Sequence, residues 1–148
     1  MLIVFGCKEQ SIKRASSEDL SPRKGICYFF FTSDCPASQN SLSKVQRIQD
    51  EYSPYGIEFI GVVSDPDLAT NQLKDILAKK NITFKIIEDE DLNNAAKHKA
   101  TITPQALLYD ETSKLIYSGM VDDYYIELGK HRNKARIKYL ENAIIEYL

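Results

Sequence analysis

The sequence predicts an α/β fold built on a central mixed sheet, with helices on both faces and an inserted helix–strand unit. Two continuous apolar runs, residues 25–31 and 57–63, are typical of parallel strands that are buried on both faces. Each run is followed by a segment whose apolar residues recur at helical spacing. Two shorter runs, residues 105–109 and 114–118, flank a polar turn and predict an antiparallel hairpin at the edge of the sheet.

The first helix is predicted to begin at Pro36, because proline is tolerated in the first turn of a helix. Residues 53–56, SPYG, contain the turn residues that end it. One face of this helix is predicted to be buried and carries Leu42, Val45, Ile48 or Gln49, and Tyr52.

A second helix is predicted to open at residues 64–67, SDPD, which supply an N-capping side chain and an early proline. Asn81 ends this helix, and residues 83–87 form a short strand. The acidic run at residues 88–91 is predicted to be a solvated turn before a brief helix at residues 93–98. The buried face of the second helix is predicted to carry Leu68, Leu73, Ile76 and Leu77.

The last segment, residues 129–148, is predicted to be helical because Ile137, Leu140, Ile144 and Tyr147 form one stripe. Asp122 and Asp123, which precede it, are predicted to lie in a solvated turn, with contact to a partner as the alternative. His98 and His131 are interpreted as surface residues without a chemical role, because neither has a recognisable spacing from a cysteine.

Composition and size limit the function. A chain of 148 residues predicts one core, and its net charge of −2 provides no electrostatic footprint for nucleic acid. The three cysteines, Cys7, Cys27 and Cys35, match neither a disulfide framework nor a zinc pattern, so neither a metal nor a cofactor is predicted. The sequence carries no signal for the oligomeric state.

The N-terminal part, residues 1–24, is predicted to be separate from a domain at residues 25–148. The start MLIVFGC is similar to the end of a bacterial lipoprotein signal, in which Cys7 would carry the lipid, although no basic region precedes it. The alternative is an apolar start that packs on the domain. Residues 8–25 contain few apolar residues and are predicted to form a tether. The lipoprotein interpretation predicts a membrane tether in the bacterial envelope or periplasm, and the alternative location is the cytoplasm.

Cys35 is the main candidate for chemistry. It lies between a buried strand and the start of a helix, the position where open α/β sheets bind ligands. The positive end of the helix dipole would stabilise a thiolate there. Asp34 would oppose this effect through its negative charge, or it could cap the helix and point away, and the sequence leaves both arrangements open.

A second element of the candidate site is Thr103-Pro104, directly before an apolar strand. A residue before proline is pushed toward extended geometry, and a proline at a strand entrance can be cis where it makes a tight turn.

The segments FFFTSDCP, IEFIGVVS, ATITPQALLYD and GMVDDYY together resemble the redoxin branch of the thioredoxin-like superfamily, over roughly residues 24–148. This branch includes the peroxiredoxin type (alkyl hydroperoxide reductase/thiol-specific antioxidant) and periplasmic thiol-disulfide oxidoreductases. The resemblance implies a thioredoxin-like fold and a redox-active thiol. It implies that Cys35 is the nucleophile, that Thr32 lies near the thiol, that Pro104 is the cis-proline and that the backbone of Thr103 pairs with a bound peptide or mixed disulfide. Asp34 and Pro36 are also predicted to be substrate-binding residues, and Ser38 is predicted to act with Cys35 and Thr32 in catalysis.

Two positions depart from the family patterns. The fourth residue of a Cys-x-x-Cys motif is here Ser38, and the proline that peroxiredoxins carry seven residues before the cysteine is here Tyr28. Ser38 could donate a hydrogen bond to a thiolate, but it cannot resolve an adduct. Cys27 is too far along the extended strand to bridge to Cys35. The related subgroup often carries a further C-terminal cysteine.

The sequence therefore predicts a single-thiol redox protein. Cys35 would attack a disulfide of a protein partner, or a small peroxide, and an external thiol would complete the cycle. The alternative is a non-catalytic binding module that uses the groove between Cys35 and Pro104.

Overall fold

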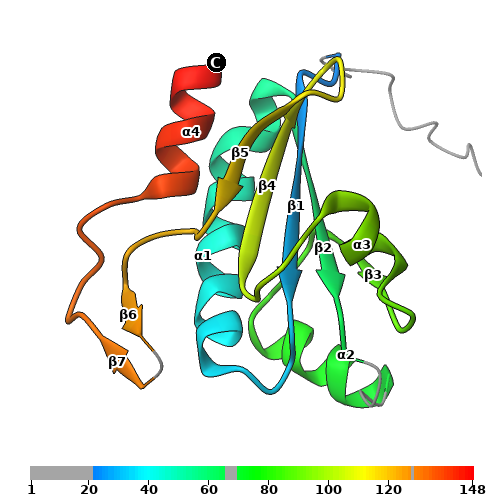
Figure 1. Ribbon diagram of the computed structural model, residues 1–148, viewed down its shortest axis with the longest axis vertical. Coiled ribbons are helices and arrows are strands. Elements are labelled where there is room, and N and C mark those ends of the chain that lie inside the picture. Colours follow the sequence, from blue (N-terminus) through cyan, green and yellow to red (C-terminus); the bar gives the residue numbers. More distant parts are fainter. Residues whose placement is uncertain (1–21, 66–69, 128) are drawn as a thin grey trace, which may run out of the picture.

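A five-stranded mixed sheet forms the centre of the molecule (Figure 1). The structure is a computed structural model that describes residues 22–65, 70–127 and 129–148. The strand order is β3-β2-β1-β4-β5. The strands are β1 (Gly25–Phe31), β2 (Ile57–Val63), β3 (Lys85–Glu88), β4 (Gln105–Asp110) and β5 (Leu115–Gly119).

The central strand β1 pairs in parallel with β2 and antiparallel with β4. β2 pairs in parallel with β3, and β5 pairs antiparallel with β4, so the mixed sheet and the edge hairpin are confirmed. Six of the seven residues of β1 are buried, as its continuous apolar sequence predicts for a strand covered on both faces. The carboxyl ends of β1 and β2 therefore lie side by side.

Helices cover both faces of the sheet, which confirms the predicted fold class (Figure 1). On one face, α1 (Pro36–Tyr52), α2 (Thr70–Lys79) and α4 (Tyr139–Tyr147) contribute to a core that contains Phe29 and Phe31 of β1. On the other face, α3 (Asn93–His98) packs near Phe30 through Ala95. The predicted stripe of α1 is buried at Leu42, Val45, Ile48 and Tyr52.

The loop after α1 brings the chain directly into β2. A short 3₁₀ helix, η1 (Ser53–Tyr55), ends at Gly56, whose φ of 91° lies in the left-handed region that favours glycine. The carbonyl of Gly56 then accepts a hydrogen bond from the Lys24 N–H at 2.9 Å. This contact fixes the entrance of β1 beside the entrance of β2.

The described part of α2 begins at Thr70, and the predicted helix start at Pro66 and Asp67, together with Leu68, lies outside the described residues. The final helix begins at Tyr139, so the prediction of a helix from residue 129 is wrong for residues 129–138. Part of that segment instead forms a hairpin of β6 (Tyr125–Glu127) and β7 (Lys130–His131). Ile137 is exposed and lies outside the helical stripe.

The acidic run before α3 is only partly solvated. Asp89 is buried, and its carboxylate accepts hydrogen bonds from the backbone N–H groups of Asn94 and Ala95, each at 2.9 Å. Burial raises the pKa of this carboxyl, but hydrogen bonds from Asn94 and Ala95 outweigh it and hold the pKa below its usual value. The prediction of a solvated turn is therefore wrong for Asp89, which binds the free amides at the start of the helix.

None of the helices within residues 22–65, 70–127 and 129–148 is long and apolar enough to cross a membrane. The lipid-carrying role predicted for Cys7 and most of the tether predicted at residues 8–25 lie outside the described residues.

Candidate functional site

Cys35 is the N-cap residue of α1, directly after the loop that follows β1. Its backbone is extended (φ −83°, ψ 118°), Pro36 follows in the first turn, and the Cys35 carbonyl accepts a hydrogen bond from the Gln39 N–H at 3.0 Å. No side chain caps the helix, and Asp34 is exposed. Of the two arrangements left open for Asp34, the structure does not contain the cap. The half-buried thiol thus stands at the positive end of a 17-residue helix.

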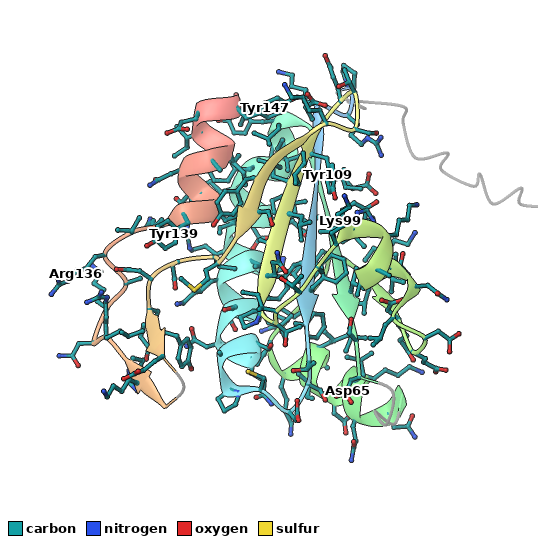
Figure 2. The ribbon with its side chains drawn as sticks, in the orientation of Figure 1. Asp65, Lys99, Tyr109, Arg136, Tyr139 and Tyr147 are labelled. Atoms are coloured by element: carbon teal, nitrogen blue, oxygen red, sulfur yellow. The ribbon has the colours of Figure 1, made fainter. Side chains whose placement is uncertain are left out.

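The loop before Cys35 is held from two neighbouring elements. The Ser33 hydroxyl donates to the carboxylate of Asp65 at 2.5 Å, and Asp65 follows the carboxyl end of β2. The Gln39 side chain, from α1, donates to the Ser33 carbonyl at 2.6 Å. Asp65 lies at the end of the sheet opposite Tyr147 (Figure 2). The loop that presents the thiol is therefore fixed by hydrogen bonds to both β2 and α1.

Ser38 lies inside the protein at the first turn of α1. Its side chain is 0% exposed, and its hydroxyl oxygen accepts a hydrogen bond from the Thr32 N–H at 3.3 Å. The hydrogen bond predicted for Ser38 was a donation to the thiolate, whereas the structure shows acceptance from the end of β1. Ser38 therefore ties the helix start to the strand.

Cys35 lines a groove with a volume of about 510 Å³. Pro36, Thr103 and Pro104 line it with Cys35, and the Thr103–Pro104 peptide bond is cis. The structure thus brings together four of the residues that the sequence singles out. Thr32, Asp34 and Ser38 are not among the lining residues, although they lie within three residues of the thiol in sequence.

The other wall of the groove is the β6–β7 hairpin, which the sequence analysis missed. Tyr125, Ile126 and His131 line the groove from this hairpin. The ring of His131 stacks on that of Tyr124 with centroids 4.9 Å apart, and its Nδ1 lies 3.0 Å from the Arg132 carbonyl oxygen. A signal for the hairpin existed: strand-forming Tyr and Ile residues precede Gly129, whose φ of 79° suits a turn. His131 is exposed, as predicted, but it lies in the groove.

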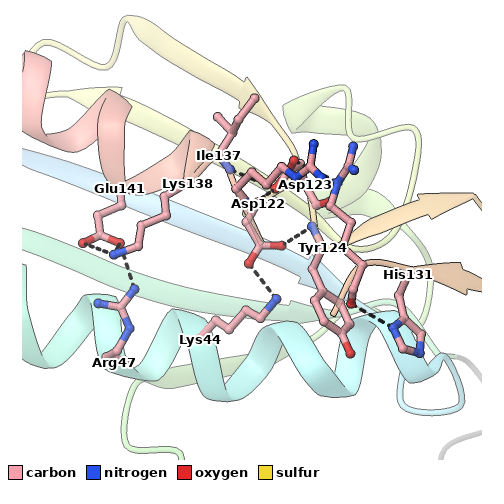
Figure 3. Close-up of polar contacts among 11 residues, drawn as sticks. Lys44, Arg47, Asp122, Asp123, Tyr124, His131, Ile137, Lys138 and Glu141 are labelled. Carbon is pink, nitrogen blue, oxygen red and sulfur yellow. Dashed lines mark hydrogen bonds and ion pairs between the residues drawn. The ribbon is translucent and has the colours of Figure 1, made fainter. Parts of the chain in front are cut away.

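Asp122 and Asp123, directly before this hairpin, contact α1 and the loop before α4, respectively (Figure 3). Asp122 pairs with Lys44 of α1 at 2.6 Å and accepts from the Tyr124 N–H at 3.0 Å. Asp123 accepts from the N–H groups of Arg136 and Ile137 at 2.6 and 2.9 Å. The hydrogen bond from Ile137 is the largest of the effects that lower the pKa of the Asp123 carboxyl. The predicted solvated turn is wrong for Asp123, which is buried.

The two described cysteines, Cys27 and Cys35, are both free. Cys27 is 0% exposed in the middle of β1, and burial raises the pKa of its thiol to about 12. It is therefore protonated at neutral pH and packed in the core. In the part of the chain that the structure describes, no group of three or more His, Cys, Asp or Glu side chains could hold a metal ion.

A central mixed sheet, with a cysteine at the start of the helix that follows its middle strand, defines a thioredoxin-like protein. The model of the AhpC/TSA family matches residues 2–118, and the chain belongs to this family. The predicted redoxin relationship is therefore confirmed.

Named relatives agree with the fold. The chain is 22% identical over 107 residues to the thiol-disulfide oxidoreductase ResA of Halalkalibacterium halodurans, covering 70% of this chain and 59% of that protein. A putative thiol:disulfide interchange protein DsbE from Chlorobium tepidum superposes with a TM-score of 0.67 at 18% identity, covering 84% of this chain and 79% of that one. A secreted disulfide oxidoreductase from Mycobacterium tuberculosis gives a TM-score of 0.62 at 14% identity, covering 83% and 81%. The chain thus spans less than two thirds of the length of ResA.

Proposed function

We propose that this protein is a thiol redox protein in which Cys35 attacks a disulfide of a protein partner. The observation that carries the proposal is the position of Cys35: it begins α1 and lines the same groove as Thr103 and Pro104. A helix start favours the thiolate form, and the groove leaves room for a partner beside the sulfur. The relatives named as thiol-disulfide oxidoreductases support the same chemistry.

The reaction balances as a two-step exchange. The Cys35 thiolate attacks one sulfur of the partner disulfide, a bond forms between the two sulfurs, and the second partner sulfur leaves as a thiolate that takes a proton from water. One thiolate of an external dithiol then attacks the partner sulfur of the mixed disulfide and releases the Cys35 thiolate. The second thiol of the dithiol displaces the partner sulfur, which leaves as a thiolate and takes a proton, and the dithiol leaves as a disulfide. With a small peroxide, the first step would instead give a sulfenic acid and release an alcohol or water.

The proposal includes an external dithiol because neither Ser38 nor the buried Cys27 can resolve a mixed disulfide on Cys35. Ser38 stands at the fourth position of the CPAS motif, and Cys27 is buried in β1 with a protonated thiol. In this proposal Thr103 and Pro104 contact the partner, Asp34 and Pro36 flank the reacting sulfur, and Ser38 and Thr32 hold the loop through their mutual hydrogen bond.

A binding module without turnover is the second candidate. The buried Ser38 favours it, since a hydroxyl in that position holds the loop in place and supplies no resolving thiol. In that case the groove would bind a partner segment without forming a covalent bond.

We further propose that the protein works in the bacterial envelope, tethered through Cys7. The secreted M. tuberculosis relative and the similarity of MLIVFGC to the end of a lipoprotein signal support this location. The cytoplasm is the alternative, and labelling of Cys7 by a fatty acid in a bacterial host separates the two.

Mass spectrometry of a trapped adduct tests the redox function. Reduced protein carrying Cys7→Ser is mixed with a symmetrical peptide disulfide, and the expected product is one peptide on Cys35, released by dithiothreitol. The Cys35→Ser variant should form no adduct, whereas the matched control Cys27→Ala should form the same adduct as the parent. Retention of the unmodified peptide disulfide on the protein, with no adduct on Cys35, would support the binding module instead.

A further inference from the structure

The groove beside Cys35 has an apolar lining that the thiol chemistry does not require. Three of its side chains expose large fractions to solvent: Ile102 56%, Met120 41% and Ile126 57%. Ile102 comes from the loop before β4, and Met120 and Ile126 come from the chain that leads into and forms the β6–β7 hairpin. Exposed apolar groups gathered around one cavity are typical of a binding site.

The charges of the groove are neutralised within the protein. The carboxylate of Asp122 pairs with Lys44 at 2.6 Å, and that of Glu127 pairs with Lys130 across the turn of the hairpin. His131 and Tyr125 are the remaining titratable side chains of the hairpin wall among the described residues; the Nδ1 of His131 lies 3.0 Å from the Arg132 carbonyl oxygen, and burial raises the pKa of the Tyr125 hydroxyl. The groove therefore suits an uncharged segment rather than an acidic or a basic one.

Buried polar groups hold both walls in place. On one side, the side chain of Gln105 accepts hydrogen bonds from the N–H groups of Thr101 and Ile102, at 2.9 and 3.3 Å. On the other side, Asp123 binds the N–H groups of Arg136 and Ile137 and so closes the loop that returns from the hairpin. Walls fixed before a ligand arrives reduce the entropy lost on binding.

We propose that the β6–β7 hairpin, together with Ile102 and Met120, forms a specificity wall that selects a cysteine flanked by uncharged apolar side chains in an extended polypeptide. The inference rests on the proposed thiol function and adds the substrate class. The apolar neighbours of the target cysteine would lie against Ile102, Met120 and Ile126 while the sulfur meets Cys35. The groove volume of about 510 Å³ lies within the range of about 300–1,000 Å³ that is typical of ligand-binding sites.

Single-turnover kinetics with activated peptides test the specificity. Two short peptides, acetylated and amidated, carry one cysteine as a 2-pyridyl disulfide, flanked on both sides by leucine or by serine. Attack by Cys35 releases pyridine-2-thione, which is followed by its absorbance, and the peptide stays on Cys35. With the Cys7→Ser protein, the leucine peptide should react about tenfold faster than the serine peptide, as a partly buried apolar contact predicts.

Substitutions in the specificity wall test whether its apolar side chains produce the preference for the leucine peptide. Ile126→Ser should reduce the ratio of the two rates to about twofold or less, and Ile102→Ser, on the opposite wall, provides a second variant in case the first does not fold. Ile145→Ser is the matched control, because Ile145 of α4 is 55% exposed and does not line the groove. This control should keep the tenfold ratio.

A small probe separates failure of this inference from failure of the proposed function. If methyl 2-pyridyl disulfide and both peptides release no thione, the thiol function and the specificity wall both fail. If the small probe reacts but the leucine and serine peptides react equally, the specificity wall alone is overturned. A faster reaction of peptides flanked by lysine or glutamate, or loss of the preference in Ile145→Ser, would also overturn it.

Discussion

Two cysteines only eight residues apart lie in very different surroundings, one inside β1 and one just after its carboxyl end. Cys27 lies in β1, fully buried, and its pKa is raised to about 12. Cys35 lies past the end of the same strand, half-buried, at the start of α1 and beside a groove. The residue type is the same, so the environment alone separates a core thiol from a candidate nucleophile. The strand interior provides stability, and its carboxyl end provides access.

The largest loss of stability is expected when an aromatic side chain is removed from the interior of β1. Phe29→Ala should lower the free energy of unfolding by about 3–5 kcal/mol, because Phe29 is buried and stacks on Phe31 with ring centroids 5.6 Å apart. Urea denaturation measures the change. Ile145→Ala, at an exposed position of α4, is the control and should change the stability by about 0.5 kcal/mol or less. A similar loss in both variants would contradict the assigned role of β1.

A smaller effect is expected where the loop before Cys35 is anchored. Asp65→Ala should cost about 1–3 kcal/mol, because it leaves the Ser33 hydroxyl without its acceptor at 2.5 Å. Asp65→Asn retains an acceptor and should lose less. Urea midpoints of the two variants give the comparison, and an equal loss would show that the hydrogen bond does not hold the loop.

The acidic residue before α3 should make stability depend on pH. The folded-state pKa of Asp89 is below its usual value of about 3.9, so its contribution is present above that pH and is lost as the pH falls through the folded-state pKa. Asp89→Asn should therefore cost about 1–2 kcal/mol at pH 7 and progressively less below pH of about 3.9. Denaturation curves at several pH values test this. A cost that stays constant down to acidic pH would contradict the role of the charge.

The smallest effect on stability is expected at the reactive position itself. Cys35→Ser should change the free energy of unfolding by about 0.5 kcal/mol or less, because the side chain is only half-buried and makes no cap hydrogen bond. Calorimetry or urea denaturation measures it. A loss as large as that of Phe29→Ala would show that Cys35 belongs to the core, like Cys27.

The elements of the main sheet could be predicted from local patterns. In β1, β2 and α1 the residues that are buried can be recognised from the local sequence alone. The two strands are continuous apolar runs, and the helix has apolar residues at helical spacing. The junction between them could therefore be located, and with it Cys35. Thr103 and Pro104 precede β4, which pairs directly with β1, and they line the same groove as Cys35.

The wall formed by β6 and β7 could not be predicted in the same way. β7 has only two residues, and the hairpin is held by contacts to distant parts of the chain, such as Asp122 to Lys44. Asp123 is a related case, because its buried carboxylate accepts a hydrogen bond from the N–H of Ile137 in the loop before α4. Asp89 is buried for a more local reason, since it binds the N–H groups of Asn94 and Ala95 at the start of α3. Sequence patterns report which side chains are polar, but not which distant amides they will meet.

The most direct test of the contrast between the two cysteines is native-state labelling of the Cys7→Ser protein with iodoacetamide, followed by peptide mass spectrometry. Labelling of Cys35 with Cys27 unmodified, and equal labelling of both after unfolding in urea, is the predicted result. Cys27 is fully buried and the pKa of its thiol is raised to about 12, whereas Cys35 is half-buried and lines a groove. Protection of Cys35 in the folded protein, or equal labelling of both thiols before unfolding, would contradict the account.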